Sequence, residues 1–196
     1  MIYYIVYFLT KFISFFLFPR RMHGTGHIPA QGGFIIASNH ISNLDPVVLG
    51  ISCIRRINFM AKIELFAKKK EPLGFILKKL GAFPVKREEA DFGALKEAIK
   101  RLKGGKPVLI FIEGTRRISD EPSKAQPGVG FLAVKANVPV IPVYIEGTQK
   151  VMSPGCKKLT RHPVHVRFGP PVQFNPQAPY EVISDTILQH IYKIAS

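Results

Sequence analysis

The chain has 196 residues and carries 28 lysines and arginines against 13 aspartates and glutamates, which gives a net charge of +15. Its 46% hydrophobic content excludes a disordered chain, and its length fits one domain with a short appendage. A nucleic-acid-binding protein would account for the positive charge but not for the hydropathy. A protein at a membrane surface would account for the charge and for the positive mean hydropathy of +0.12.

The two cysteines, Cys53 and Cys156, lie far apart and have no partner spacing. They therefore predict neither a disulfide framework nor a zinc site, and they favour a reducing, cytosol-facing compartment.

Residues 1–18 are nearly all apolar, and Pro19, Arg20 and Arg21 follow them. The positive charges come after the apolar run and no cleavage site follows, which argues against a secretory signal. On a helix the more polar side chains would share one arc of roughly 100°, opposite an apolar face. These side chains are Tyr3, Tyr7, Thr10, Lys11 and Ser14.

This pattern favours a helix that lies in the membrane interface with Arg20 and Arg21 at the headgroups. A short membrane-spanning helix and a helix docked on the protein core stay open as alternatives. We expect residues 1–21 to form a membrane-associated helix and residues 22–196 to form the catalytic domain. The basic flank and the charge predict a location at the cytoplasmic face of the inner or plasma membrane.

From residue 22 onward, short apolar runs alternate with helical patterns. The runs predict strands at 34–38, 57–61, 108–112, 140–145 and 164–168. Helices are predicted over 92–103, over 130–136 and near the C-terminus, where isoleucines recur from Ile183 to Ile194. Strands that are apolar throughout are covered on both faces. The fold class is therefore α/β, with a mixed, largely parallel sheet flanked by helices.

Residues 65–80 combine five lysines with an apolar stripe. One interpretation is an ordinary amphipathic surface helix whose lysine stems lie along apolar surface. The other is a second membrane contact beside the N-terminal helix, where each lysine would add about 1 kcal/mol on an anionic leaflet.

Directly after the predicted strand 34–38 comes a polar segment that contains His40 and Asp45. The ends of buried strands are where α/β sheets place their sites. If a turn and Pro46 break the helix, the carboxylate can orient the imidazole, whose other nitrogen can then accept a hydroxyl proton. The alternative is that Asp45 only caps a helix and His40 is an ordinary loop histidine.

A second polar segment, residues 113–117, follows the predicted strand 108–112. Gly114, a threonine and two arginines could hold a phosphate there, because a guanidinium group offers a rigid fork of donors. A solvated strand-end turn is the alternative. Two weaker segments are 81–87, which predicts a short strand that ends in Lys86 and Arg87, and 138–143, which predicts a strand with proline at its entry and has no evident chemistry. The sequence contains no G-x-S-x-G or metal-binding motif, so we expect neither an acyl-enzyme nor a metal or cofactor.

Together and in this order, the four segments resemble the blocks of the 1-acyl-sn-glycerol-3-phosphate (lysophosphatidate) acyltransferases, a family of glycerolipid acyltransferases. The family's blocks read N-H-x-x-x-x-D, then G-x-x-F/P-V/I-x-R, F-P-E-G-T-R-S and V-P-V/I-x-P-V, and the resemblance covers about residues 22–175. Ile112 stands where the family usually has proline, and Arg117 stands where serine is common.

The resemblance implies that His40 is the catalytic base and that Asp45 orients it. His40 would deprotonate the sn-2 hydroxyl of lysophosphatidate, which attacks an acyl-CoA or acyl-(acyl carrier protein) thioester and yields phosphatidate for phospholipid biosynthesis. The resemblance also implies a set of substrate-binding residues, namely Arg87, Glu113, Gly114, Thr115, Arg116 and, as a lesser contact, Lys62.

Two other functions stay open. A related enzyme could acylate another lysophospholipid or a lyso-glycolipid with the same His–Asp pair. A basic nucleic-acid-binding module is disfavoured, because the chain has no helix-turn-helix, RNA-binding or zinc signature and its positive charges are spread along the chain. The expected partners are therefore an anionic membrane, lysophosphatidate and an acyl donor, and no nucleic acid.

Overall fold

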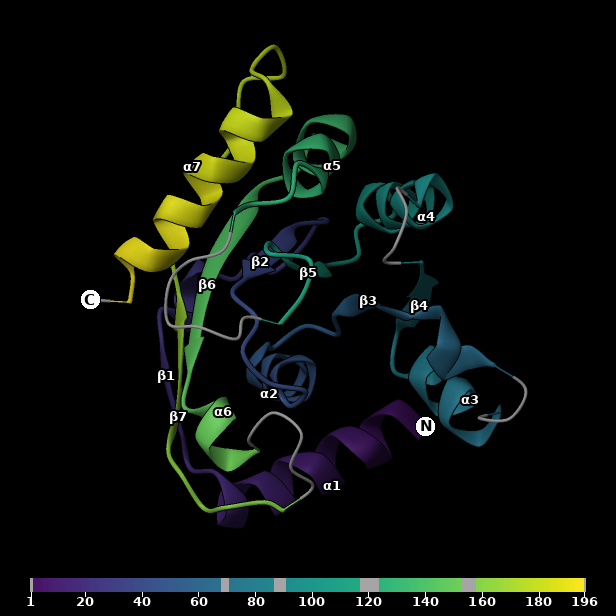
Figure 1. Ribbon diagram of the computed structural model, residues 1–196, viewed down its shortest axis with the longest axis vertical. Coiled ribbons are helices and arrows are strands. Elements are labelled where there is room, and N and C mark those ends of the chain that lie inside the picture. Colours follow the sequence, from purple (N-terminus) through teal and green to yellow (C-terminus); the bar gives the residue numbers. More distant parts are fainter. Residues whose placement is uncertain (1, 68–70, 87–90, 117–123, 153–157, 196) are drawn as a thin grey trace.

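The computed structural model describes residues 2–67, 71–86, 91–116, 124–152 and 158–195. Within these ranges the strands form one seven-stranded sheet in the order β1-β7-β6-β2-β5-β3-β4 (Figure 1). Neighbouring strands of this sheet run parallel except β6 and β7, which are antiparallel. The predicted mixed, largely parallel sheet is confirmed. The strands are β1 (Arg20–His23), β2 (Ile35–Ser38), β3 (Asn58–Lys62), β4 (Ala82–Val85), β5 (Val108–Phe111), β6 (Val140–Glu146) and β7 (Val164–Phe168).

Helices cover both faces of the sheet (Figure 1). On one side lie α4 (Phe92–Lys103), α5 (Gly128–Ala136) and α7 (Tyr180–Lys193). On the other side lie α1 (Ile2–Leu17) and α2 (Asp45–Ser52), with the one-turn helix α6 (Thr148–Val151) at one end. The helix α3 (Glu71–Lys79) lies near β4, and single 3-10 turns form at Thr25–His27 and Ile63–Phe66.

The core is divided by the sheet into two layers. Along β2, Ile35 and Ala37 pack into the layer beneath α4, α5 and α7, whereas Ile36 packs into the layer beneath α1 and α2. All three side chains are fully buried. Because β2 is covered on both faces, its sequence is an unbroken apolar run and not an alternating one.

The structure adds one strand that the sequence did not predict. Residues 20–23 form β1, which pairs with β7 so that Arg20 lies opposite Val164. Two of its four residues are arginines and a third is histidine, so no apolar run marked it as a strand. The expected domain boundary at residue 21 therefore falls inside β1. Arg20 is half-buried in this strand, and burial lowers the pKa of its guanidinium.

The helix α1 turns its polar side toward the protein. Ser14 is fully buried and Tyr7 packs against the core, whereas most of the apolar side chains point outward. The outward side chains are between 44% and 71% exposed, and they are Tyr4, Ile5, Phe8, Leu9, Phe12, Ile13, Phe15 and Phe16. The helix has 16 residues, and none of the helices described in the structure is long and apolar enough to cross a membrane.

Asp91 caps the amino end of α4. Its carboxylate accepts hydrogen bonds from the backbone N–H groups of Lys86 and Ala94, and these donors lower the pKa of the Asp91 carboxyl. We expect Asp91→Ala to lower stability by about 1 kcal/mol, or about 2–4 °C in thermal unfolding.

The effect of Asp91 should depend on pH in one direction. Because its pKa is lower in the folded chain than in the unfolded one, its contribution is fully present above about pH 4 and is lost as the pH falls further. Asp185→Ala, an exposed change on α7, is the control. A gap between wild type and Asp91→Ala that stayed constant down to pH 2 would contradict the assignment.

Candidate active site

The candidate site begins at the carboxyl end of β2, in the middle of the sheet. Asn39 is fully buried there, and its side-chain amide makes two hydrogen bonds to the backbone of Ile145 on β6, at 2.8 and 2.9 Å. This paired contact ties the end of β2 to its neighbour. The chain direction just before His40 is therefore rigidly set.

His40 and Asp45 meet as the sequence predicted. The imidazole Nδ1 lies 2.8 Å from Asp45 Oδ2, and the two residues are 4% and 0% exposed. Asp45 is the first residue of α2, with Pro46 in its first turn, so the loop between His40 and the helix returns the carboxylate to the ring. Because Nδ1 donates to a carboxylate, Nε2 is the nitrogen left to accept a proton.

Four donors hold the Asp45 carboxylate in place. Besides His40, the backbone N–H groups of Ile41 and Ser42 donate to Oδ2 at 2.7 and 2.8 Å. The hydroxyl of Thr148, at the start of α6, donates to Oδ1 at 2.6 Å. A carboxylate held in this way cannot turn away from the imidazole, so His40 stays in one tautomer and one orientation.

The face of the imidazole ring stacks on the ring of Phe111, the last residue of β5. The ring centroids are 3.8 Å apart and the planes are nearly parallel, at 13°. Two residues further on, Glu113 is 3% exposed, and its Oε2 accepts the backbone N–H of His40 at 3.1 Å. The neighbouring strand thus supports both the ring and the backbone of the histidine.

Tyr192 on α7 completes this support. Its hydroxyl donates to Glu113 Oε1 at 3.0 Å, and its ring packs edge-to-face on Tyr144 of β6. The last helix is therefore linked through Glu113 to the main chain of His40. This chain of contacts makes Glu113 and Tyr192 positioning residues for the site.

We expect Tyr192→Phe to lower kcat about 3- to 10-fold and stability by about 1–2 kcal/mol, because it leaves a buried carboxylate oxygen without this donor. Steady-state kinetics and thermal unfolding measure the two effects. Tyr180→Phe is the matched control, since Tyr180 lies on the same helix as Tyr192 and its ring packs on Phe131 of α5. A Tyr192→Phe variant that matched wild type in both measurements would refute the positioning role.

The remaining predicted site residues lie at the same edge of the sheet or outside the described residues. Gly114, Thr115 and Arg116 follow Glu113 and are exposed, and Lys62 is exposed at the end of β3. Gly114 has a φ of +73°, and a Cβ there would lie 3.1 Å from the Gln126 side chain, so the turn needs glycine. Arg87 lies outside the described residues, and the substrate contacts predicted for this group stay predictions.

Sequence reasoning missed three residues of the site. Thr148 and Tyr192 lie 103 and 79 residues from the carboxylates that they contact, and no local pattern marks either one. Phe111 belonged to a predicted strand, but its packing on His40 depends on the pairing of β5 with β2. The order of the strands, which is a property of the fold, brings these residues to the histidine.

The arrangement can carry out general-base chemistry. In the described part of the chain, no serine, threonine or cysteine hydroxyl or thiol is hydrogen-bonded to His40. In the same residues no group of three or more His, Cys, Asp or Glu side chains could hold a metal ion. A buried His–Asp pair at the edge of a sheet defines a proton-transfer site that can activate a bound hydroxyl group.

Comparison with known proteins identifies the family. The family model described as Acyltransferase matches residues 19–146, and the chain belongs to this family. The sequence resemblance to glycerolipid acyltransferases is confirmed.

Named relatives refine this picture. A 1-acyl-sn-glycerol-3-phosphate acyltransferase of Bacillus subtilis is 38% identical over 128 residues, which are 65% of this chain and 62% of the relative. A probable enzyme of the same name from Mycoplasma genitalium is 29% identical over 180 residues, 83% of this chain and 64% of the relative. The chain thus spans less than two thirds of the length of either relative.

The fold is also found in a solved structure. The crystal structure of PlsC, the 1-acyl-sn-glycerophosphate acyltransferase from Thermotoga maritima, matches with a TM-score of 0.76 and 25% identity. The match covers 97% of this chain and 77% of the PlsC chain. The likeness therefore extends over nearly the whole of this chain.

Proposed function

We propose that the chain transfers an acyl group from an acyl thioester, acyl-CoA or acyl-(acyl carrier protein), to the sn-2 hydroxyl of 1-acyl-sn-glycerol-3-phosphate. The observation that carries this proposal is the buried His40–Asp45 pair, with Nε2 of His40 left as a base. Membership of the acyltransferase family supports the reaction class. The names of the relatives in Bacillus subtilis and Mycoplasma genitalium support lysophosphatidate as the acceptor.

The reaction follows from the geometry of the pair. Nε2 of His40 accepts the hydroxyl proton as the acceptor oxygen attacks the thioester carbonyl carbon, and a new C–O bond forms. The tetrahedral intermediate collapses, the C–S bond breaks, and the proton on Nε2 passes to the leaving thiolate, which departs as the free thiol. Asp45 stabilises the imidazolium ion that exists between these two steps. No acyl-enzyme forms in this scheme.

The phosphate of the acceptor is bound by the residues that follow β5 and β4. Arg116 and Arg87 supply the guanidinium groups. Lys62 is the last residue of β3, and Gly114, Thr115 and Arg116 come shortly after the last residue of β5, at the same carboxyl edge of the sheet. Both carboxylate oxygens of Glu113 already accept hydrogen bonds, from the His40 backbone N–H and from the Tyr192 hydroxyl. We therefore propose that Glu113 supports substrate binding indirectly, by holding the backbone of the site.

Arg116→Ala should raise the KM for lysophosphatidate by about 10- to 100-fold, since a hydrogen bond from guanidinium to phosphate contributes about 1.5–3 kcal/mol. The KM for the acyl donor should change much less. Arg116→Lys keeps the positive charge but not the forked donors of arginine, so its KM for lysophosphatidate should lie between those of wild type and Arg116→Ala. Lys135→Ala, an exposed change on α5, is the control. Equal losses for acceptor and donor would count against the phosphate contact.

We further propose that α1 lies in the cytoplasmic leaflet of the inner or plasma membrane. Eight large apolar side chains of α1 are exposed, while its Ser14 and Tyr7 pack inward, so the apolar face is unpartnered within the described residues. The helix α3 also exposes Leu73, Phe75 and Ile76. An interfacial helix keeps the site at the surface where a lysolipid acceptor resides.

An acceptor panel tests the proposed function. The protein is given one acyl-CoA and, in turn, lysophosphatidate, lysophosphatidylcholine, lysophosphatidylglycerol and a phosphate-free monoacylglycerol. We expect the highest kcat/KM with lysophosphatidate. Equal turnover of the phosphate-free acceptor would contradict it, and preference for another lysolipid would favour the alternative of a different headgroup with the same His–Asp chemistry.

A further inference from the structure

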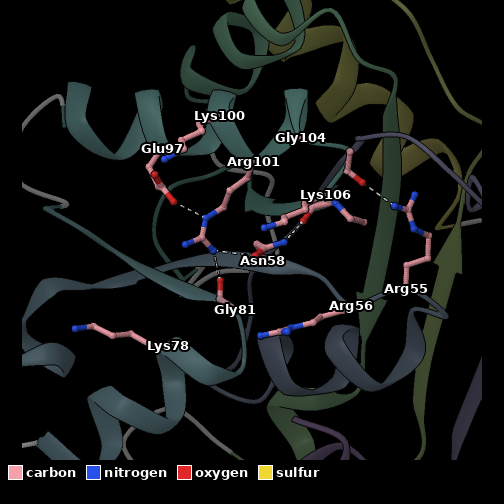
Figure 2. Close-up of a pocket in the computed structure, with 12 residues that line it drawn as sticks. Arg55, Arg56, Asn58, Lys78, Gly81, Glu97, Lys100, Arg101, Gly104 and Lys106 are labelled. Atoms are coloured by element: carbon pink, nitrogen blue, oxygen red, sulfur yellow. Dashed lines mark hydrogen bonds and ion pairs between the residues drawn. The ribbon is translucent and has the colours of Figure 1, made fainter. Parts of the chain in front are cut away.

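A pocket with a volume of about 750 Å³ lies at the end of the strands opposite the active site. Figure 2 shows the side chains that line it. It is lined by Asn58, Gly81 and Pro107, which stand at or just before the first residues of β3, β4 and β5. His40 and Glu113 follow the last residues of β2 and β5. Because these strands are parallel, the pocket and the catalytic pair lie at opposite edges of the same sheet.

The side chains of the pocket are strongly basic. Six cationic residues and one acidic residue, Glu97, line it; the cationic residues are Arg55, Arg56, Lys78, Lys100, Arg101 and Lys106. Figure 2 shows Lys100 and Glu97 entering from α4, with Lys78 and Arg56 on the opposite side of the pocket. The charges therefore surround the space from at least two elements.

The arginines are held mostly by neutral groups. Arg55 donates to the backbone carbonyls of Pro29, Gly32 and Gly105. Arg101 donates to Asn58 Oδ1, to the Gly81 carbonyl and to the carboxylate of Glu97. Carbonyl oxygens fix a guanidinium group without neutralising it. Among the described residues that line the pocket, Glu97 is the one acidic side chain that offsets this charge.

Helix termini offset part of the positive charge of the pocket. The carboxyl ends of α3 and α4 lie at the pocket, and each contributes roughly half a negative charge that favours nearby lysines. Two such ends and Glu97 offset about two of the six positive charges. The remaining charge calls for a multivalent anion, and a phosphate group matches both the charge and the donors.

A second hollow indicates what carries that phosphate. It has a volume of about 340 Å³ and shares Lys78 with the basic pocket. The rest of its lining is Phe66, Glu71, Gly74 and Phe75. On the other side, Arg56 stacks on the ring of Tyr3 in α1, with 4.6 Å between its guanidinium carbon and the ring centroid. The basic pocket therefore borders aromatic surface on α3 and on the helix with the exposed apolar face.

We propose that this pocket binds the phosphate headgroup of an anionic phospholipid, at a site separate from the catalytic centre. The acyl chains of that lipid would pass along Phe66 and Phe75 toward the surface where α1 lies. This proposal rests on the proposed membrane contact of α1 and is independent of the acyl-transfer chemistry. Such a lipid would hold the amino edge of the sheet against the membrane.

A pair of double variants tests the site. Lys100→Gln with Lys106→Gln removes two exposed pocket lysines that have no side-chain partner among the described residues, so the fold should be kept. Lys96→Gln with Lys103→Gln is the matched control, because it removes two exposed charges from α4, the helix of Lys100, at positions outside the pocket. Both variants lose the same net charge.

Binding is measured on vesicles of phosphatidylcholine alone, with 20 mol% phosphatidate, and with phosphatidylglycerol at the same total charge. Wild type should bind neutral vesicles through α1 and should gain affinity when phosphatidate is added. The pocket variant should lose about 10- to 30-fold in affinity for phosphatidate vesicles, because each lysine contributes about 1 kcal/mol, while neutral vesicles are bound as before. The control variant should lose at most about 3-fold.

Three results would overturn the proposal. Equal losses in both double variants would show unspecific surface charge, and no gain from phosphatidate in wild type would show no headgroup site. Displacement of the protein from phosphatidate vesicles by millimolar CoA, but not by inorganic phosphate at equal ionic strength, would assign the pocket to a soluble nucleotide ligand. Turnover in neutral detergent micelles, expected to be unchanged in the pocket variant, separates this test from that of the acyl-transfer function.

Discussion

Replacing His40 with alanine should lower kcat for acyl transfer by about 10³-fold or more, which corresponds to about 4 kcal/mol of transition-state stabilisation. The imidazole is the general base of the proposed reaction, and its Nδ1 is already committed to Asp45. Among the described residues, no side chain is hydrogen-bonded to Nε2 of His40, so none is placed to replace it as the base. The KM for either substrate should change little, because the ring acts on the hydroxyl proton and not on the phosphate.

The measurement is steady-state kinetics together with thermal unfolding. Alanine removes a ring that packs on Phe111, so some loss of stability is expected and the unfolding temperature must be compared. His23→Ala is the matched control, since His23 is exposed at the end of β1. A folded His40→Ala protein with kcat within 10-fold of wild type would contradict the role of His40 as the base.

Asp45→Asn should lower kcat by about 10²- to 10⁴-fold and leave the fold intact. The amide oxygen can accept the three N–H donors that now point at Oδ2, and the Thr148 hydroxyl can turn to accept from the amide nitrogen. The variant therefore keeps the orientation of His40 while it removes the negative charge. The predicted loss measures how much that charge stabilises the imidazolium ion.

Kinetics and unfolding again provide the test, with Ser52→Ala as the control. Ser52 is buried on the same helix, and its hydroxyl has no hydrogen-bond partner among the described residues, so its removal should affect neither kcat nor folding strongly. If Asp45→Asn kept more than a tenth of wild-type kcat, the carboxylate would be a structural cap of α2 and not part of the catalytic pair. That outcome would restore the simpler interpretation of the motif.

Much of the fold could be predicted because buried strands have a simple sequence pattern. The strands predicted at 164–168 and 140–145 correspond to β7 (Val164–Phe168) and β6 (Val140–Glu146). The helix predicted over 92–103 is α4, which an aspartate caps and two glycines follow. In contrast, β1 is charged and exposed along most of its length, and only its pairing with β7 makes it a strand.

The orientation of α1 illustrates a different limit. The sequence showed two faces on this helix but did not show which one meets the protein. A docked surface helix would bury its apolar face. Here Ser14 is buried and its hydroxyl donates to the Lys11 carbonyl, so burial of this polar group costs little. Tertiary packing, and not amphipathicity alone, decided the outcome.

The site was predictable where its residues are close in sequence. His40 and Asp45 are five residues apart, and Pro46 indicated the break that brings them together. Tyr192 and Thr148 come from other elements, and their contacts depend on strand order and helix placement. The basic pocket could not be predicted from the sequence for the same reason. Its lining residues are spread from Arg55 to Pro107, and only the pairing of the strands brings them together.

The most direct test of the account is thiol release from acyl-CoA with and without lysophosphatidate, followed in the first turnover. Direct attack by an activated acceptor hydroxyl predicts no burst of free thiol without acceptor. With acceptor, it predicts one thiol released for each phosphatidate formed. A burst approaching one thiol per chain in the absence of acceptor, with the acyl group found on the protein by mass spectrometry, would contradict the proposed mechanism.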